Sequence, residues 1–554
     1  MYTSSKRKLD VSIIYNKANH FGLEHDAELL KQTLTNANVK TVDPLEIPSP
    51  ADINIHLEVP IYSYVPWGTY NIFVMNPEFY NKAWDPYMKH FDAIITKENV
   101  GIGTVLPWTM VPFTKKPLEK VKEFLYLLGH SKNKMKFAKL LLVLWKESYP
   151  SLHVYSTEPL DISLPSNVFL HVEDLEKEKR ETLLQTYAGH ICCSMSEGFG
   201  FPAAEAEYVG AFTLLNTLPV YKQDYKDSKN IYWIVSPVAK NSEIYPYASF
   251  VESIDADLDA AMEAFACFTP SDSKQFEKKQ KAFKRNLDAI LDTLVPKKKT
   301  VLPPILERKD CPHISVVTLL YNRRRFFELA RHNMILTDYP KNKIQWIIVD
   351  DSDNPDEQAS DKIIQTIEQF TGMDIHYVPL QKKTPISQKR NIGVTHCSND
   401  IILFMDDDDH YPQTSFRRRV AWLTKHPMKP RAVCCTTIAC YDLLKGISAV
   451  NCPPFDIPLG QRISEATLTF YKSWFEQRPF DNDIQVGEGD SFVCGRESEV
   501  LEIPPQQIIV AFSHDKNTSS RRIPASENVE PSCFWGFPQE YLTFIHGLAG
   551  MKVV

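Results

Sequence analysis

The feature that most limits the fold of this chain is an alternation of short apolar, β-branched runs with longer segments of helical period. Such alternation is typical of doubly wound α/β units built on parallel sheets. It predicts two Rossmann-like units in the first part of the chain, at 1–115 and 116–295. There we expect strands at 11–15, 70–75, 92–96, 124–128, 153–156, 168–171 and 190–194, and helices at 25–36, 134–148, 176–185 and 273–294.

A stretch rich in proline and charge interrupts the pattern near 294–312. Exposed linkers have this composition, and we place a linker at 296–311. The remainder, 312–554, begins with the same alternation and predicts a further α/β domain. Its expected strands are 314–320, 345–349, 375–378 and 401–405, and its expected helices are 326–336 and 361–370.

Charge and cysteine content exclude several classes of protein. The formal net charge is −7, whereas a general nucleic-acid binder needs a basic surface. The eleven cysteines are odd in number and include no C-x-x-C pair, which predicts free thiols in a reducing compartment and argues against structural zinc. No apolar run approaches the ~20 residues of a membrane helix. We therefore expect a soluble, cytoplasmic enzyme.

Four consecutive aspartates, Asp406 to Asp409, follow the expected strand 401–405. Their like charges repel unless solvent or a cation relieves them, so an isolated run would be a solvated loop. In open α/β sheets, however, ligands bind beyond the carboxyl ends of strands. Carboxylates fixed there suit Mg²⁺ or Mn²⁺, with substrate phosphates completing the coordination.

Two further segments agree with a phosphate-bearing ligand. The segment 349–353 (VDDSD) places Asp350 and Asp351 at the end of a second strand. The segment 388–393 (QKRNIG) places Lys389 and Arg390 just before an expected helix, where cations can meet phosphates.

These segments, in this order, resemble the family 2 glycosyltransferases of GT-A fold, over roughly 314–522. The resemblance implies an inverting, metal-dependent transfer, with Asp406 and Asp408 at the D-x-D position. It implies a metal site of Asp408, Asp406 and His514. A downstream acid acts as general base in this family; here it is Asp490 or Glu488, and we favour Asp490. The implied donor contacts are Thr318, Asp350, Asp351, Lys389, Arg390, Asp406 and Asp407.

In the first part, 196–206 (SEGFGFPAAEA) places two glutamates eight residues apart across a glycine-rich turn and a helix start. Glycines let backbone N–H groups approach a ligand, and a helix N-terminus favours anions. By itself, this pattern also fits an ordinary turn and capped helix. It resembles the Glu-x7-Glu motif of retaining family 4 transferases of GT-B fold. The resemblance implies a catalytic Glu197 and donor contacts from Gly198, Glu205, Lys132 and Lys136.

The first part departs from that family at two loops. His130 stands where the family usually has an arginine, and the glycine loop expected at 19–24 holds a single glycine. The leading hypothesis is a bifunctional glycosyltransferase that adds successive sugars from nucleotide-sugar donors to a glycan or glycoconjugate acceptor. The alternative keeps only the GT-A module catalytic and makes the first part a glycan-binding or scaffold module. A nucleotidyltransferase is disfavoured because no glycine-rich phosphate loop follows the strand 314–320. Peripheral membrane contact is compatible with either hypothesis.

Overall fold

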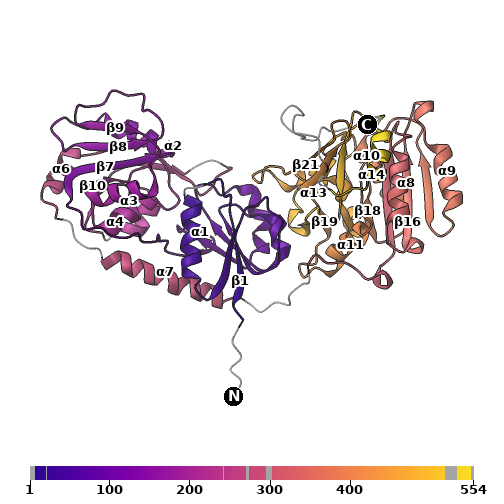
Figure 1. Cartoon of the computed structure of the whole chain (residues 1–554), viewed down its shortest axis with the longest axis horizontal. Coiled ribbons are helices and arrows are strands. Elements are labelled where there is room, and N and C mark those ends of the chain that lie inside the picture. The colour runs from indigo at the N-terminus through magenta and orange to yellow at the C-terminus, as the bar shows by residue number, and fades with distance from the viewer. Residues whose placement is uncertain are drawn as a thin grey trace, which may run out of the picture. The chain divides into compact units, whose positions relative to one another are not determined.

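The structure is a computed structural model that describes residues 7–19, 22–226, 228–240, 243–269, 274–294, 302–517, 533 and 535–550. The chain divides into two compact units (Figure 1). Unit 1 comprises Met1–Pro44, Ala51–Pro60 and Tyr70–Pro296, and unit 2 comprises Leu45–Pro50, Ile61–Thr69 and Lys297–Val554. Part of the expected glycine loop and residues 296–301 of the expected linker lie outside the described residues.

Unit 1 contains a first six-stranded sheet in the order β2-β1-β3-β4-β5-β6. Its strands are β1 (Leu9–Ile14), β2 (Ala37–Val42), β3 (Ala51–Leu57), β4 (Gly68–Met75), β5 (Ala93–Thr96) and β6 (Thr104–Val105). β1 pairs in parallel with β2 and β3, and β5 pairs in parallel with β4 and β6. Helix α1 (Gly22–Thr33) and the long helix α7 (Lys274–Asp292) pack their apolar side chains into the core of this sheet.

A second sheet of unit 1 has the order β12-β11-β10-β7-β8-β9, with every pairing parallel. This is the 3-2-1-4-5-6 order of the dinucleotide-binding fold, whose ligands bind where the order reverses. The reversal lies between β7 (Val121–Gly129) and β10 (Tyr187–Ile191). The other strands are β8 (Leu152–Ser156), β9 (Val168–Val172), β11 (Phe212–Asn216) and β12 (Ile231–Ile234), and the helices are α2 (Lys132–Leu142), α3 (Lys177–Thr186), α4 (Phe201–Val209), α5 (Pro219–Tyr225) and α6 (Leu258–Ala266).

Unit 2 is built on a mixed seven-stranded sheet in the order β17-β16-β15-β18-β22-β19-β23. Figure 1 labels β16, β18 and β19 of this sheet. The first four strands are parallel, and β22 runs antiparallel to both of its neighbours. β15, β16 and β18 are buried along their whole length, as expected of central parallel strands. The strands are β15 (Ile314–Leu320), β16 (Ile344–Asp350), β17 (Asp374–Pro379), β18 (Ile401–Phe404), β19 (Ala432–Cys434), β22 (Thr469–Tyr471) and β23 (Val500–Glu502).

A three-stranded sheet, seven α-helices and several short 3₁₀ helices complete the regular structure described for unit 2. The sheet has the order β21-β20-β24, with β20 (Ile438–Asp442), β21 (Ile447–Asn451) and β24 (Val510–Ser513). The helices are α8 (Phe327–Leu336), α9 (Ser360–Gln369), α10 (Ile386–Thr395), α11 (Ser415–Lys425), α12 (Lys472–Gln477), α13 (Glu488–Val493) and α14 (Gln539–Leu548). Leu306 and Cys311, from the end of the expected linker, are buried in the core of this unit.

The structure corrects the local setting of two predicted segments. Lys389 and Arg390 lie inside α10, not before a helix, because Pro385 caps a helix that already begins at Ile386. Asp490 lies in the first turn of α13, not in an open turn, because Gly487 in the left-handed conformation starts a helix at Glu488.

Two general expectations concern the thiols and the apolar segments. Each of the eleven cysteines is a free thiol, as the sequence predicts. Among the described helices, none has both the length and the apolar character needed to cross a membrane.

Candidate active sites

The acidic loop of unit 2, which consists of Asp406 to Asp409, is held in place from both sides. It directly follows the buried strand β18 (Ile401–Phe404). The Asp406 amide donates a hydrogen bond to the Tyr411 hydroxyl (2.9 Å), and the Phe512 amide of β24 donates one to the Asp409 carboxylate (2.9 Å). The loop is therefore a fixed structure at the end of the sheet and not a solvated, flexible segment.

Three carboxylates of this loop converge. One oxygen each from Asp406, Asp408 and Asp409 lies within 4.8 Å of the other two. Asp407 is also buried; burial raises its pKa to about 7, and its Oδ2 atom has no hydrogen-bond partner. A buried set of oxygen ligands is what Mg²⁺ or Mn²⁺ requires, so these residues fit a divalent cation.

His514 and Arg323 join this group. The buried His514 ring stacks on Phe326 (centroids 4.1 Å apart), and its Nε2 lies 3.1 Å from Asp408 Oδ2. The structure thus brings the expected metal residues together. Sequence reasoning missed Arg323, whose Nη1 bonds to Asp407 (3.0 Å) and Asp408 (2.7 Å). Its signal was the run of three arginines at 323–325, which begins two residues after the strand 314–320.

Asp350 and Asp351 lie at the end of β16 and are both buried. Asp350 accepts hydrogen bonds from the Ser352 amide (3.0 Å) and the Tyr377 hydroxyl (3.2 Å). Asp351 accepts one from the Thr384 amide (2.8 Å) and pairs with Lys389. These partners fix both carboxylates at the carboxyl edge of the sheet.

Thr318 lies inside β15 and is fully buried. Its hydroxyl accepts a hydrogen bond from the Trp346 indole (3.0 Å), so the structure places it in the core. At the edge itself lie Asn322 and Asp353, the last residue of the segment 349–353, which are joined by a 2.7 Å hydrogen bond from Asn322 Nδ2. They follow β15 and β16 and extend the polar edge of the sheet.

Arg390 links the acidic loop to α13. It is buried; its Nε donates to Glu488 Oε1 (2.6 Å), and its Nη1 lies 3.8 Å from Asp406 Oδ1. The neighbouring Glu465 accepts a hydrogen bond from the Gly489 amide (3.1 Å), and burial raises its pKa to about 7. A buried charge is tolerated when it is paired, and Glu488 supplies that pairing.

Asp490 is half-buried on the first turn of α13 and has no cationic partner among its described contacts. Gln461 Nε2 donates to its Oδ2 (3.2 Å). A Cβ atom at Gly460 would lie 2.6 Å from Asp490 Oδ1, so only glycine leaves that oxygen uncovered. This is a suitable setting for a carboxylate that must reach a substrate hydroxyl.

In unit 1, the predicted segments meet between β7 and β10, where the strand order of the second sheet reverses; we call this place the switch point. Glu197 is half-buried, and Lys134 Nζ, from the first turn of α2, lies 3.8 Å from its Oε1. Lys132 and Lys136 are exposed and point to no described partner. The lysine that the structure brings to Glu197 is therefore Lys134.

The other residues of the Glu-x7-Glu segment have specific neighbours. Gly198 packs so closely on Asn76 that a Cβ atom would lie 2.0 Å from Asn76 Oδ1. Glu205 is buried, and Arg180 engages both of its oxygens, with Nη2 to Oε2 at 2.5 Å. The two glutamates of the segment therefore have different surroundings. Both oxygens of Glu205 are paired with Arg180, whereas Glu197 is half-buried and lies 3.8 Å from Lys134 Nζ.

Sequence reasoning missed two further acids near Glu197. Glu58 follows β3 and accepts a hydrogen bond from Asn76 Nδ2 (2.8 Å). Glu78 follows β4 and accepts one from Asn133 Nδ2 (2.8 Å). Burial, together with the charges of Glu197 and Glu58, raises the pKa of Glu78 to about 8. Glu78 had one sequence signal, its position shortly after the expected strand 70–75.

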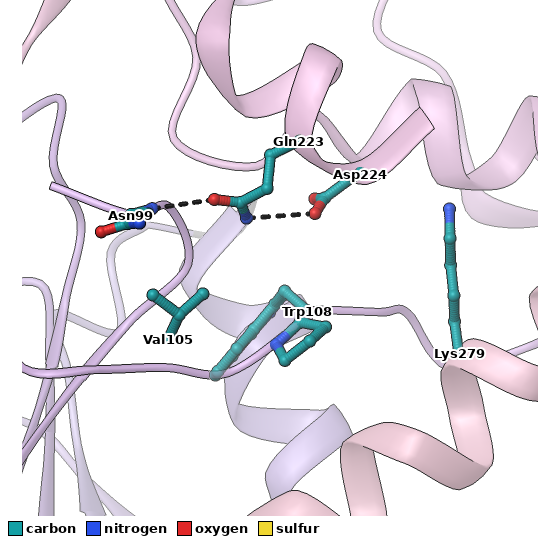
Figure 2. A pocket seen from close by; sticks show the side chains of 7 residues that line it. Asn99, Val105, Trp108, Gln223, Asp224 and Lys279 are labelled. Atoms are coloured by element: carbon teal, nitrogen blue, oxygen red, sulfur yellow. Dashed lines mark hydrogen bonds between the residues drawn. The ribbon is translucent and has the colours of Figure 1, made fainter. Parts of the chain in front are cut away.

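A separate pocket of about 350 Å³ in unit 1 contains none of the predicted site residues (Figure 2). Its polar walls are largely paired: the Asn99 amide donates to Gln223 (2.8 Å), Gln223 donates to Asp224 (3.2 Å), and Lys279 pairs with Glu207 (2.8 Å). Burial raises the pKa of Asp224 to about 6.

Comparison with known proteins agrees with the geometry of unit 2. The model of the family "Glycosyl transferase family 2" matches residues 315–474, and no curated protein matches the chain. Similar solved structures include the mannosyltransferase PcManGT from Pyrobaculum calidifontis in complex with GDP-Man and Mn²⁺ (16% identity, 40% of this chain and 62% of that chain, TM-score 0.31). Others are S. aureus TarS (15%, 36% and 37%, 0.26) and TarS 1-349 in complex with UDP-GlcNAc (15%, 38% and 61%, 0.28).

The chain thus spans less than two thirds of the length of each of these structures. The family model runs from within β15 into α12. It matches the part of unit 2 in which the carboxyl ends of β15, β16 and β18 bring the acidic groups together. Residues 315–474 therefore match a glycosyltransferase domain of family 2.

Proposed function

We propose that unit 2 transfers a sugar from a nucleotide-sugar donor to a glycan or glycoconjugate acceptor, with inversion and with a requirement for Mn²⁺ or Mg²⁺. The observation that carries this proposal is the convergence of Asp406, Asp408 and Asp409 at the end of β18. These residues and His514 would hold the ion. When bound, it would stabilise the negative charge on the departing diphosphate.

The residues of unit 2 divide into three roles in this proposal. Asp490 takes the proton from the acceptor hydroxyl as the new bond forms. Asp350 and Asp351 hold the nucleotide part of the donor at the sheet edge. Lys389 and Arg390 are buried in ion pairs with acids, so they act by positioning: Lys389 fixes Asp351, and Arg390 fixes Glu488 beside the acidic loop.

The test uses the full chain, stripped with EDTA and then supplied with Mn²⁺ or Mg²⁺, against a panel of UDP- and GDP-sugars. The anomeric configuration of the product is read by NMR. We expect transfer with inversion that needs the added ion and that Asp408→Ala abolishes. Inverted product formed at the full rate in EDTA would refute the metal role, and metal-dependent transfer that Asp408→Ala abolishes but that retains the configuration would refute direct displacement.

We further propose that unit 1 is a second, retaining transferase of GT-B type that needs no metal. Support comes from the strand order of its second sheet and from the position of Glu197 and Gly198 at the switch point, before the N-terminus of α4. Together the two units would add successive sugars to one glycan.

The competing function for unit 1 is a glycan-binding or scaffold role without catalysis. One observation favours it: His130, which stands at the expected arginine position, is exposed and lies 3.4 Å from Asp174. The test is turnover of the same donor panel in EDTA. Donor-dependent product that Glu197→Gln removes supports the transferase. Glycan binding without any such turnover supports the scaffold.

A further inference from the structure

A short segment of unit 2 determines where α13 carries Asp490. We call residues 459–462 the support segment. Gln461 Nε2 donates a hydrogen bond to Asp490 Oδ2 (3.2 Å), and a Cβ atom at Gly460 would lie 2.6 Å from Asp490 Oδ1. The support segment and the first turn of α13 are therefore in direct contact, and a shift of one displaces the other.

Arg462 fixes the support segment to the interior of unit 2. Its side chain is buried; Nε donates to the Ile457 carbonyl (3.1 Å), and Nη1 donates to Glu502 Oε1 (2.8 Å) on β23. The Arg462 amide also donates to the Leu459 carbonyl (2.8 Å), which closes the turn of the support segment. Glu502 is 3% exposed, and a buried carboxylate is costly unless it is paired. The ion pair with Glu502 thus joins the support segment to β23.

Segment 61–69 covers Arg462 from a distant part of the sequence. It follows β3 and runs into β4, two strands of unit 1, yet it belongs to unit 2. Its short helix Tyr62–Trp67 lies against β23, and Trp67 is part of the core of unit 2. The Tyr62 side chain is buried, and the Arg462 Cζ atom lies over its ring, 5.7 Å from the ring centroid. A guanidinium over an aromatic face is attracted to it, and the attraction grows when water is excluded.

We propose that Arg462 is a positioning residue for Asp490, and that Tyr62 keeps the Arg462 side chain in place. Both residues are buried, so they act on Asp490 through the support segment and not on a substrate. Transfer by unit 2 therefore depends on a segment from the first part of the chain. The inference rests on the proposed role of Asp490 as general base and adds the residues that position it.

The test compares full-chain variants in the metal-dependent transfer reaction of unit 2. Tyr62→Leu should lower kcat at least about tenfold and leave the donor KM unchanged, because a misplaced catalytic group slows the chemical step. Tyr62→Phe should restore kcat, since the ring face over Arg462 is kept. Arg462→Lys should also lower kcat, because an ammonium lacks the planar set of donors that reaches Ile457 and Glu502 together.

Tyr339→Leu is the control for the loss of a buried tyrosine. Tyr339 lies in the core of unit 2, and its hydroxyl donates to the Pro312 carbonyl (2.6 Å). We expect this variant to have a lower melting temperature and an unchanged kcat per folded molecule. Hydrogen exchange gives a readout that needs no activity. The amides of 459–462 and 488–493 should exchange faster in Tyr62→Leu, but not in Tyr62→Phe or Tyr339→Leu.

The outcomes separate this inference from the proposed function. If the wild type shows no transfer, or if Asp490→Asn turns over normally, the proposed function of unit 2 fails, and hydrogen exchange still decides whether Tyr62 holds the support segment. If Asp490→Asn is inactive but Tyr62→Leu and Arg462→Lys turn over like the wild type, only this inference is refuted. Equal losses of kcat in Tyr62→Leu and Tyr339→Leu would show a general effect of stability and would refute it as well. If Tyr62→Leu does not fold, the kcat of Arg462→Lys decides.

Discussion

At the scale of single residues, Asp490 and Glu488 stand two positions apart on α13 but have different surroundings. Glu488 is buried and paired with Arg390 (2.6 Å), whereas Asp490 is half-buried and bound only by Gln461 among its described contacts. A general base must be reachable and free to accept a proton. The structure therefore supports the choice of Asp490 that the sequence left open.

The corresponding prediction separates chemistry from stability. Asp490→Asn should lower the turnover of unit 2 by about 10²- to 10⁴-fold, because the proton acceptor is lost, while donor binding persists. Glu488→Gln should mainly lower the melting temperature, because it leaves Arg390 buried without its counter-charge. Steady-state kinetics and calorimetry on both variants check this. Normal turnover in Asp490→Asn, with a dead but stable Glu488→Gln, would reverse the assignment.

Glu78 gives a prediction of pH dependence. Its pKa is raised by burial from 4.5 to about 8, so between these values the folded chain binds more protons than the unfolded chain. Stability therefore falls as pH rises through this window. Glu58 and Glu197 face Glu78, and Lys134 lies beyond Glu197; these charges act in the same window.

Glu78→Gln removes the titrating group and keeps the shape of the neutral acid. The melting temperature of unit 1, followed by calorimetry, should thus fall less between about pH 6 and about pH 9 in this variant than in the wild type. Glu147→Gln, which is exposed, should behave like the wild type. Parallel pH profiles for Glu78→Gln and the wild type would show that Glu78 is ionised at neutral pH.

At the scale of elements, the contact between α13 and the short helix Leu459–Gln461 decides where Asp490 points. A Cβ atom at Gly460 would lie 2.6 Å from Asp490 Oδ1 and 2.7 Å from its Cα atom. Gly460→Ala should therefore displace α13 and lower kcat at least about tenfold, since small misplacements of catalytic groups are costly. Gly372→Ala, where a Cβ atom meets nothing within 4 Å, is the matched control. An unchanged kcat in Gly460→Ala would mean that α13 can move to accept the added methyl group without any loss of catalysis.

Strands with continuous apolar runs could be predicted from sequence, and strands with buried polar residues could not. The expected strand 314–320 is β15, because all seven of its residues are buried. β3 was missed because Asn54 and His56, although fully buried, make it read as polar. Since β3 was missed, so was Glu58 at its end.

The same limit applies to the sites. The acidic loop could be predicted because its residues are contiguous and follow a readable strand. Glu78 could not be assigned, because its partner Asn133 is 55 residues away and no local pattern joins them. Arg390 was recognised as a cation, but its partner Glu488 is 98 residues away, so its buried position was not foreseen.

At the scale of the whole molecule, the boundary between the units does not follow a single cut of the chain. Residues 61–69 belong to unit 2, and Trp67 from this segment lies in the core of that unit, 6.3 Å from the Trp422 ring. A fragment that begins after residue 297 would lack this tryptophan. Variants of the full chain, and not fragments, therefore give the clean separation of the two proposed activities.

Two single-site variants of the full chain test whether joining the units matters. Asp408→Ala should retain only the unit 1 activity, and Glu197→Gln only the unit 2 activity. A flexible connection gives a second binding event an effective concentration on the order of millimolar, which a mixture of separate molecules at low concentration lacks. An equimolar mixture of the two variants should thus form less doubly extended product than the wild type at nanomolar enzyme, as measured by mass spectrometry. The difference should vanish as the mixture is concentrated, because diffusion between molecules then supplies the intermediate. Equal yields at every dilution would show that the intermediate leaves the chain before the second transfer.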